Sequence, residues 1–422
     1  MAAFIVEGGY PLNGRERVSG AKNAALPILA ACLICPGQVR LFDCPRLRDV
    51  DNMLAILAEL GVGWRWEEAG GALALDVSGA TGYTMPQRIS KELRSSIFML
   101  GPLLARFGRA VCTYPGGCEI GNRPIDLHLS GLSALGVRIR EQGGLILCDG
   151  ARMRGADIHL DYPSVGATEN IMMAAVAAEG DTYIRNAARE PETEDLQAFL
   201  NALGCDVSGA GTSNVRIRGG AKPRPYAEHT IMPDRIVAGT LLCAAAITGG
   251  EITLDNVVPQ HIGSMLSKLR EAGCVAACGE NTVSLSAPAR LSEIKLIETL
   301  PYPGFPTDMQ AQFFALATVA DGACVIVENV FENRFKHGPE LMRMGAVYTQ
   351  KDRTTVIRGV EELTGAQVTA RDLRGGAALT IAGLRARGVT TIYGAELIDR
   401  GYEALDTQLR ALGAHITREE NI

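Results

Sequence analysis

Apolar and polar positions follow a pattern along the chain that recurs about every 70 residues. Each copy begins with a run of small and apolar residues that stops at a glycine, as in "AGTLLCAAAITGG", and continues with a β-branched stretch such as "ITLDN". The run predicts a helix and the β-branched stretch a strand. A polar loop then leads into a second amphipathic segment, in which Leu405, Leu409 and Leu412 recur at helical spacing. A further strand is expected to close the unit.

The second helix of each copy ends in a leucine–glycine signature, as in "SGLSALGV" and "TQLRALGA". The glycines of six such copies are Gly61, Gly136, Gly204, Gly273, Gly345 and Gly413. Helices and strands that alternate in repeated units indicate an α/β protein. The first helix of each copy is apolar nearly all round, which predicts that it is buried with sheets around it. The expected architecture is an inside-out α/β barrel.

The strongest break between copies follows the third one, at "GAKPRPYAEHTIMPD", which carries three prolines and several charges. A chain of 422 residues is too long for one ordinary core. We therefore expect two domains of three repeats each, the first over residues 22–230 and the second over residues 1–21 and 231–422. Ligand sites favour clefts between domains, so we expect the active site in the interdomain cleft.

Composition and charge restrict the function classes. The net charge of −6 argues against broad binding of nucleic acid, which requires a basic face. The amino-terminal "MAAFIVEGGYPLNG" lacks the basic region and long apolar core of a signal peptide. The longest apolar run, residues 24–35, contains Pro27 and is shorter than the roughly 20 residues that cross a bilayer. We expect a cytoplasmic protein that does not associate with membranes.

The cysteines and histidines do not predict a metal site. The chain has 11 cysteines, an odd number, and several lie in apolar segments as expected for reduced thiols of the cytosol. "CLIC" at residues 32–35 has the spacing of zinc ligands, but its flanks are apolar and no second Cys or His pair follows nearby. The six histidines form no HxH or HExxH pattern.

The second copy departs from the others in the loop "PGGCEIGNRPIDLH", residues 115–128, where another copy has "NVVPQHIG". Loops between a strand and a helix often carry ligand groups. Cys118 lies there among glycines, with Arg123 nearby, and this combination favours a reactive thiol over a purely structural one.

Basic residues recur at equivalent places of the repeats. They stand at the starts of first helices or in the loops between a strand and the second helix: Lys22, Arg94, Arg374, Arg123 and Arg400. Helix starts offer unpaired N–H groups that suit phosphate. This set in an acidic chain predicts an anionic, phosphorylated ligand. Asp308 in "FPTDMQAQ" also stands at a helix start, where an Asp more commonly serves as an N-cap.

Seven motifs in a fixed order, from Ser19 to Glu403, resemble those of one enzyme family: "SGAKNAALPIL", "PGGCEIGNRPIDLH", "SVGATEN", "NAAREPE", "FPTDMQAQ", "VFENRF" and "DRGYE". The family is that of the UDP-N-acetylglucosamine 1-carboxyvinyltransferases, which are enolpyruvyl transferases. The resemblance implies two inside-out α/β domains with the substrates in the cleft. It implies transfer of enolpyruvate from phosphoenolpyruvate to the 3-hydroxyl of UDP-N-acetylglucosamine, with release of phosphate. This is the first committed step of peptidoglycan synthesis, and it uses no metal or organic cofactor.

The resemblance also assigns roles to residues. The catalytic residues are Cys118 as the acid, Asp308 as the base, Lys22 and Arg400. The residues implied to bind phosphoenolpyruvate are Lys22, Asn23, Arg123 and Arg400. Those implied to bind UDP-N-acetylglucosamine are Arg94, Arg123, Pro124, Ile125, Asp126, Leu127, Tyr162, Pro163, Ser164, Val165, Asp308 and Val330.

Two positions differ from the family pattern. Val237 stands where an acidic residue is expected, and Gly338 stands where a larger residue is usual, which concerns local packing more than chemistry. Three alternatives remain open: a transferase of the same fold acting on shikimate 3-phosphate, a paralogue that has become a regulator or scaffold, and a six-unit binding protein for nucleic acid or partners. The cysteine loop and "SVGATEN" argue against the first alternative. The intact Cys118, Asp308 and Lys22 argue against the second, and the acidic charge counts against nucleic acid.

Overall fold

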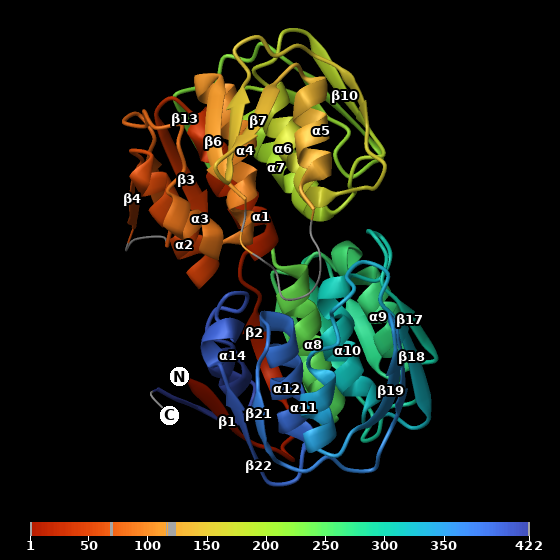
Figure 1. Ribbon diagram of the computed structural model, residues 1–422. Coiled ribbons are helices and arrows are strands. Elements are labelled where there is room, and N and C mark those ends of the chain that lie inside the picture. Colours follow the sequence, from red (N-terminus) through yellow and green to blue (C-terminus); the bar gives the residue numbers. More distant parts are fainter. Residues whose placement is uncertain (1, 68–70, 115, 117–123, 421–422) are drawn as a thin grey trace. The chain divides into compact units, whose positions relative to one another are not determined.

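Three central helices lie inside each half of the chain (Figure 1). The computed structural model describes residues 2–67, 71–114, 116 and 124–420. The described residues form two compact units. Unit 1 holds residues 2–19 and 233–420, and unit 2 holds residues 20–67, 71–114, 116 and 124–232.

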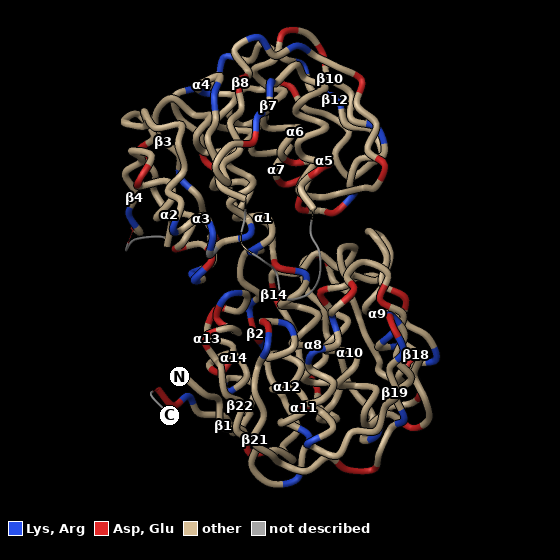
Figure 2. Tube along the Cα trace, in the orientation of Figure 1, with Lys and Arg blue, Asp and Glu red and all other residues tan. Residues whose placement is uncertain are grey.

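The central helices of unit 1 are α8 (Arg235–Thr248), α10 (Gln310–Ala317) and α12 (Leu373–Arg385), which pack on one another. All 14 residues of α8 are buried, and the tubes of α8 and α10 are almost free of charged residues (Figure 2). Small residues allow the close packing: a Cβ on Gly239 would lie 2.5 Å from Sδ of Met265 and 2.9 Å from Cε of Met309. The helices are apolar all round because no face meets water.

A four-stranded sheet packs against each central helix of unit 1. The first sheet has the order β15 (Val275–Cys278), β16 (Thr282–Ser286), β14 (Glu251–Asp255), β2 (Asn13–Arg17). The second has the order β17 (Leu296–Glu298), β18 (Ala323–Val327), β20 (Thr354–Arg358), β19 (Val347–Lys351). The third has the order β21 (Gln367–Thr369), β22 (Val389–Tyr393), β1 (Ala3–Glu7), β23 (His415–Glu419).

All three sheets have one plan. The strand after the central helix pairs in parallel with one strand on one of its edges, and two further strands in antiparallel order follow on its other edge, as in β17-β18-β20-β19. The amino-terminal residues complete this plan at two places. Strand β1 inserts between β22 and β23, with Phe4 opposite both Ile392 and Arg418, and β2 pairs with β14. The amino terminus therefore belongs to unit 1.

Unit 2 has the same plan around α1 (Lys22–Ala31), α4 (Leu100–Phe107) and α6 (Val165–Ala175). Two sheets are four-stranded: β13 (Tyr226–Thr230), β3 (Gln38–Phe42), β5 (Leu73–Asp76), β4 (Gly63–Trp66); and β11 (Asp206–Ser208), β12 (Asn214–Arg218), β10 (Asp181–Arg185), β9 (Asp157–His159). The remaining one has three strands, β6 (Arg109–Thr113), β8 (Leu145–Asp149), β7 (Arg138–Gln142). A single parallel bridge between Thr84 and Val111 takes the place of its fourth strand.

The remaining helices connect the strands. In unit 2 they are η1 (Cys32–Ile34), α2 (Arg48–Glu59), α3 (Gln87–Glu92), η2 (Arg94–Met99), α5 (Asp126–Ala134) and α7 (Pro191–Ala202). In unit 1 they are η3 (Pro259–Ile262), α9 (Gly263–Glu271), η4 (Thr307–Met309), α11 (Gly338–Arg343), α13 (Ala395–Ile398) and α14 (Leu405–Ala411).

The leucine–glycine signature is a helix cap made six times. Each of its glycines has a φ between +87° and +98°, a conformation that residues with a Cβ adopt only with strain. The residue after the glycine donates its N–H to the carbonyl of the leucine five positions earlier, at 2.9–3.1 Å, as Val62 does to Leu57 and Ala414 to Leu409. These are Schellman caps. They explain the period in the sequence and confirm the predicted α/β fold of six repeats.

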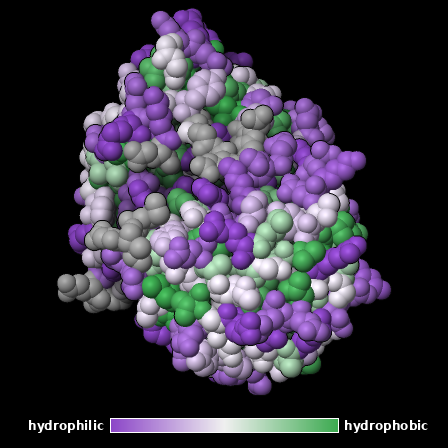
Figure 3. All heavy atoms as spheres, turned by 60° about the horizontal axis from the view of Figure 1, so that its bottom comes forward, coloured by the Kyte–Doolittle hydropathy of each residue, from purple (hydrophilic) through white to green (hydrophobic). Residues whose placement is uncertain are grey.

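Within the described residues, no helix is long and apolar enough to cross a membrane. On the face that Figure 3 presents, apolar residues gather in patches that polar side chains interrupt.

Candidate active site

Asp308 of unit 1 lies between two buried guanidinium groups. Its Oδ1 accepts a hydrogen bond from Nη2 of Arg334 at 2.5 Å, and its Oδ2 accepts one from Nη2 of Arg374 at 3.0 Å. The two arginine side chains are 5% and 3% exposed, and that of Asp308 is 27% exposed. The carboxylate therefore stands at the surface with its two counter-charges beneath it.

Asp308 differs in its side-chain partners from two other aspartates near the central helices of unit 1. Asp234 and Asp372 stand at the starts of α8 and α12, and each accepts two backbone N–H groups of its own helix. Asp308 lies within η4, which directly precedes α10. Its two carboxylate oxygens bind the side chains of Arg334 and Arg374.

The arginines determine the charge state of Asp308. Burial raises the pKa of this carboxyl, but the positive charges of Arg374 and Arg334 and their hydrogen bonds lower it more, so that the pKa lies well below its usual range. Asp308 is thus ionised at neutral pH and is a weak base while both arginines hold it.

Arg374 rests on a buried polar network that joins all three central helices. Its guanidinium lies 5.1 Å from the ring centre of Tyr402. The Tyr402 hydroxyl lies 3.0 Å from both Oγ1 of Thr240 on α8 and Nε2 of Gln312 on α10. Because the Thr240 hydroxyl donates to the carbonyl of Ile236, it accepts the proton of Tyr402. The tyrosine oxygen also accepts from Gln312. Burial lowers the pKa of the Arg374 guanidinium, but the charges of Tyr402, Asp308 and Asp234 raise it by more, so that it lies above its ordinary value.

Arg400 lies two residues before Tyr402, in the segment that follows α13. It is half-buried, and its neighbour Gly401 is a position of close approach. A Cβ on Gly401 would lie 2.3 Å from Cδ1 of Leu373 and 3.4 Å from Nη1 of Arg374. The backbone beside Arg400 thus lies against the arginine that holds Asp308. Unit 1 brings these predicted residues together.

Val330 is connected to Asp308 through a residue that sequence reasoning missed. The buried carboxylate of Glu328 accepts the backbone N–H groups of Val330 and Phe331 at 2.9 and 3.1 Å. It also accepts the hydroxyls of Thr299 and of Thr307, which directly precedes Asp308, at 2.8 and 2.9 Å. Glu328 therefore fixes the Val330 loop to the turn that carries Asp308. The letters "VEN" resemble an ordinary strand end and gave no signal for this role.

Unit 2 holds Lys22 and Asn23 at the start of α1. The Nζ of Lys22 lies 2.7 Å from Oδ2 of Asp49 in the first turn of α2, and both side chains are buried. Asp49 was also missed, since a run such as "LRDVDN" is typical of any helix start. Asp49 thus fixes the position of the buried Lys22 amine.

The predicted sugar-nucleotide residues of unit 2 converge on His128. Its Nδ1 accepts from Nδ2 of Asn170 at 2.9 Å, and a Cβ on Gly166 would lie 2.9 Å from its Cε1. Burial and, to a smaller extent, the charge of Arg94 lower the pKa of His128 to about 4, against a rise from Asp126. The neutral ring therefore joins η2, α5 and α6. The predicted residues lie at the starts of these elements: Arg94, Pro124, Ile125, Asp126, Leu127, Tyr162, Pro163, Ser164 and Val165.

Two of these positions differ in exposure and role. Ser164 caps α6 by accepting the N–H of Ala167 at 3.3 Å. Tyr162 is 44% exposed, an open position for a large aromatic side chain. An exposed ring beside a helix start is well placed to pack on a ligand.

Cys118 and Arg123 lie outside the described residues, so their predicted roles stay predictions. Gly116, two positions earlier, is described. A Cβ there would lie 1.8 Å from the carbonyl oxygen of Lys91, so the chain passes the end of α3 at a distance that only glycine permits.

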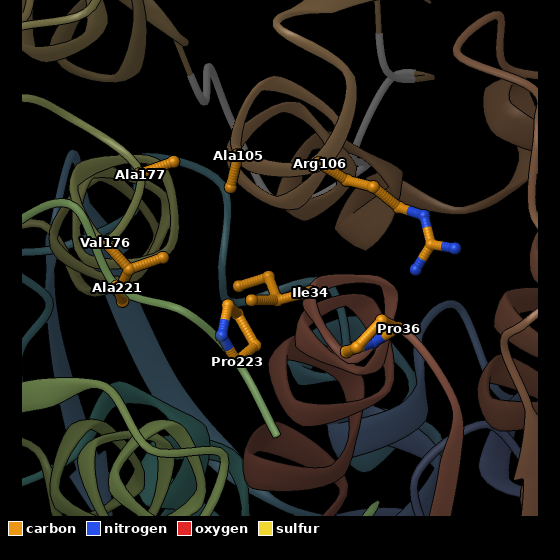
Figure 4. A pocket seen from close by; sticks show the side chains of 8 residues that line it. All are labelled: Ile34, Pro36, Ala105, Arg106, Val176, Ala177, Ala221 and Pro223. Carbon is orange, nitrogen blue, oxygen red and sulfur yellow. The ribbon is translucent and has the colours of Figure 1, made fainter. Parts of the chain in front are cut away.

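Unit 2 also has a cavity of about 200 Å³ at the carboxyl ends of its central helices, lined by Ile34, Pro36, Ala105, Arg106, Val176, Ala177, Ala221 and Pro223 (Figure 4). Arg106 donates to the carbonyls of Leu33, Cys35 and Val77 at 2.6–3.0 Å, and in the figure its side chain extends away from Val176 and Ala177. The cavity contains none of the predicted site residues. Among the described residues, no cluster of three or more His, Cys, Asp or Glu could hold a metal ion.

Comparisons with known proteins define the class. Residues 6–418 match the family described as EPSP synthase (3-phosphoshikimate 1-carboxyvinyltransferase). The enolpyruvyl transferase NikO from Streptomyces tendae has a TM-score of 0.88 and 24% identity, over 99% of this chain and 98% of that chain. EPSP synthase from Acinetobacter baumannii has a TM-score of 0.74 and 20% identity over 100% of both chains. The fold is that of the enolpyruvyl transferases.

Similar sequences narrow this class. A protein of Caldanaerobacter subterraneus subsp. tengcongensis, named UDP-N-acetylglucosamine 1-carboxyvinyltransferase 2, is 50% identical over 418 residues, which is 99% of this chain and 100% of the relative. A UDP-N-acetylglucosamine 1-carboxyvinyltransferase of Myxococcus xanthus is 47% identical over 423 residues and 100% of both chains. The chain therefore belongs to the UDP-N-acetylglucosamine 1-carboxyvinyltransferase family of enolpyruvyl transferases, as its motifs predicted.

Proposed function

We propose that the chain transfers the enolpyruvyl group of phosphoenolpyruvate to the 3-hydroxyl of UDP-N-acetylglucosamine and releases phosphate, the first committed step of peptidoglycan synthesis. The family supports this reaction, since relatives about 50% identical over nearly the whole chain carry that name. The single structural observation that carries the proposal is Asp308, an ionised carboxylate held at the surface by two buried arginines. The carboxylate supplies a base, and the two arginines beside it supply positive charge that suits an anion.

The reaction is an addition followed by an elimination. The sugar hydroxyl oxygen bonds to C2 of phosphoenolpyruvate, its proton passes to a base, and an acid delivers a proton to the methylene carbon C3. A proton then leaves the new methyl group as the C2–O bond to phosphate breaks, which restores the double bond. The addition thus needs an acid and a base on the two sides of one carbon–carbon bond.

We assign the acid to Cys118 and the base to Asp308. Cys118 can also form a covalent adduct at C2. Cys118→Ser is expected to abolish turnover while the fold stays intact, because a hydroxyl is a much weaker acid than a thiol. Turnover at the parental rate in this variant would contradict the assignment.

Asp308 is a weak base while both arginines hold it, and the substrate can change this. Phosphoenolpyruvate carries a carboxylate and a phosphate, which are strong ligands for guanidinium groups. An anion that draws Arg374 or Arg334 towards itself removes positive charge from Asp308. The pKa of the carboxyl then rises and the base becomes stronger when the substrate is present.

Lys22, Asn23, Arg123 and Arg400 are proposed to bind phosphoenolpyruvate. Its two anionic groups require several cations close together, and charge-assisted hydrogen bonds stabilise the charge that develops as phosphate leaves. The sugar nucleotide is assigned to the residues around His128 and to Asp308 and Val330. Residues of both units are therefore proposed to serve one pair of substrates.

We place the reaction in the cytoplasm. Ten described cysteines are free thiols, and all but Cys278 are buried. Reduced thiols used as small apolar side chains are typical of proteins from reducing compartments.

The acceptor distinguishes this function from that of EPSP synthase. Purified protein is mixed with phosphoenolpyruvate and either UDP-N-acetylglucosamine or shikimate 3-phosphate, and released phosphate is measured. Release with the nucleotide sugar alone is the expected result. Release with shikimate 3-phosphate alone would overturn the proposal.

A further inference from the structure

We propose that Arg418 is a positioning residue for Arg400, which it holds in place through an ion pair with the preceding residue, Asp399. The inference rests on the proposed function, in which Arg400 binds phosphoenolpyruvate. Asp399 is the first residue of the "DRGYE" motif, whereas Arg418 lies outside the motifs, and neither residue is assigned to a substrate.

The pair has the geometry of a two-pronged clamp. Nη1 of Arg418 donates to Oδ1 of Asp399 at 2.9 Å, and Nη2 donates to Oδ2 at 2.8 Å. Two parallel hydrogen bonds between planar groups fix orientation as well as distance. Asp399 directly precedes Arg400, so a fixed orientation of Asp399 also restricts the backbone of Arg400, one peptide unit away.

Arg418 itself is held by the sheet. It lies on β23, where Ile416 and Arg418 point inward and Thr417 points outward. Its backbone pairs with the buried Phe4 of β1, and its guanidinium lies 5.8 Å from the Phe4 ring centre. Glu420 accepts a hydrogen bond from Nε and so occupies the remaining edge of the guanidinium. The clamp is therefore anchored to the edge of the β21-β22-β1-β23 sheet.

The other side of Arg400 is anchored in the core. Gly401 lies against Leu373 and Arg374, and the Tyr402 hydroxyl is bound to Thr240 and Gln312. Arg400 thus stands between a fixed surface contact at Asp399 and a fixed buried contact at Tyr402. Only the surface contact can be removed without disturbing the arginines that hold Asp308.

The segment needs such support because the local structure is short. Helix α13 has four residues, too few to be stable without tertiary contacts. A displacement of about 1 Å in a binding group can lower a rate by about a hundredfold. A guanidinium that must meet a small dianion therefore depends on the residues that fix its backbone.

The test compares Arg418→Met with Arg185→Met. Methionine keeps much of the apolar part of the Arg418 side chain over Phe4 but removes the guanidinium and its two hydrogen bonds to Asp399. Arg185 also forms two parallel hydrogen bonds with one carboxylate, from Nε and Nη2 to Asp157 at 3.0 and 3.1 Å. It lies on β10 of unit 2, and neither β10 nor β9, which carries Asp157, contains a predicted site residue. The KM for each substrate, kcat and the thermal midpoint are measured for both variants and for the parent.

We expect Arg418→Met to raise the KM for phosphoenolpyruvate about tenfold or more and to leave the KM for UDP-N-acetylglucosamine unchanged. Arg418→Lys keeps the positive charge but cannot donate two parallel hydrogen bonds to one carboxylate. Its KM for phosphoenolpyruvate should lie between those of the parent and of Arg418→Met. Asp399→Asn should raise the KM for phosphoenolpyruvate about as much as Arg418→Met does. The double variant Asp399→Asn/Arg418→Met should raise this KM no further than either single substitution, because both remove the same ion pair. Arg185→Met should leave both KM values unchanged.

Two results would overturn the positioning role. One is an unchanged KM for phosphoenolpyruvate in Arg418→Met. The other is an equal rise of both KM values together with a lower thermal midpoint, which indicates a structural role alone. Arg400→Ala separates this inference from the proposed function. If Arg400→Ala raises the KM for phosphoenolpyruvate and Arg418→Met does not, only the clamp fails; if Arg400→Ala has no effect on that KM, the role of Arg400 itself fails.

Discussion

Asp308 and Asp372 share Arg374 but bind different parts of it. Asp372 caps α12 by accepting the backbone N–H groups of Arg374 and Gly375, both at 2.9 Å. Asp308 binds the side chains of Arg334 and Arg374. The first turn of α12 thus connects the cap of one central helix to the carboxylate in front of another.

Asp308 is expected to make the folded protein sensitive to acid. Its folded pKa lies below its ordinary value of 3.8, so its contribution to stability is present above about pH 4 and is lost as the pH falls through the folded pKa. The free energy of unfolding, measured in urea from pH 5 to pH 2.5, should fall less steeply for Asp308→Asn than for the parent over this window. Parallel curves would show that the ion pairs do not stabilise the fold.

His337 is expected to lower the free energy of unfolding in a different range of pH. Both of its ring nitrogens are buried without a hydrogen-bond partner, and burial lowers its pKa from 6.5 to about 4 although Asp372 raises it. The unfolded histidine takes up a proton below about pH 6.5 and the folded one does not, so stability should fall by up to about 3 kcal/mol between pH 6.5 and 4. His337→Phe, measured by urea unfolding at pH 7 and pH 5, should remove most of this loss. If His337→Phe lost as much stability between pH 7 and pH 5 as the parent, His337 would not be the source of the loss.

Gly338 is explained by Tyr348. The family pattern has a larger residue at 338, but a Cβ there would lie 2.5 Å from the Tyr348 hydroxyl oxygen and 2.7 Å from its Cζ. Gly338→Ala should therefore lower the free energy of unfolding by about 1–3 kcal/mol, although alanine favours a helix. The same change in a Tyr348→Ala background should be neutral or stabilising. Additive effects in the double variant would show that the two positions are independent.

Gly116 is expected to control the reactivity of Cys118 nearby. Because a Cβ at 116 would overlap the Lys91 carbonyl, Gly116→Ala forces the backbone away from α3. We expect kcat to fall at least tenfold and the rate of Cys118 alkylation to change, with an unaltered thermal midpoint. Gly263→Ala is the control, since its added Cβ meets nothing within 4 Å and its backbone is helical, with a φ of −54°. Equal kcat in the two variants would contradict a special role for Gly116.

Much of the fold was predictable because its signals are local. Each of the six caps requires a glycine with positive φ and a leucine five positions before the residue that follows the glycine. Both residues are visible in the sequence. The all-round apolar helices likewise predicted burial. The insertion of β1 between β22 and β23 was not foreseen, because pairing between the two ends of the chain has no local signal.

The site was predictable only in part, because many of its contacts join residues that are far apart in the sequence. The motifs pointed to Asp308, Lys22 and Arg400. The letters around Asp308 and Asp372 are alike, and the difference arises from Arg334 and Arg374, which lie 26 and 66 positions away from Asp308. Tyr402 and Thr240, which support Arg374, are 162 positions apart. Such contacts follow from tertiary packing, and the spacing of residues in one sequence does not encode them visibly.

The most direct test of the account is the turnover of Asp308→Ala. Phosphate release is measured with saturating phosphoenolpyruvate and UDP-N-acetylglucosamine, and binding of the nucleotide sugar is measured by calorimetry on the same preparation. If Asp308 is the base, kcat should fall by about 10²- to 10⁴-fold. The Kd for the nucleotide sugar should rise far less than kcat falls, because the residues around His128 also bind it. A variant that releases phosphate at the parental rate would contradict the central claim.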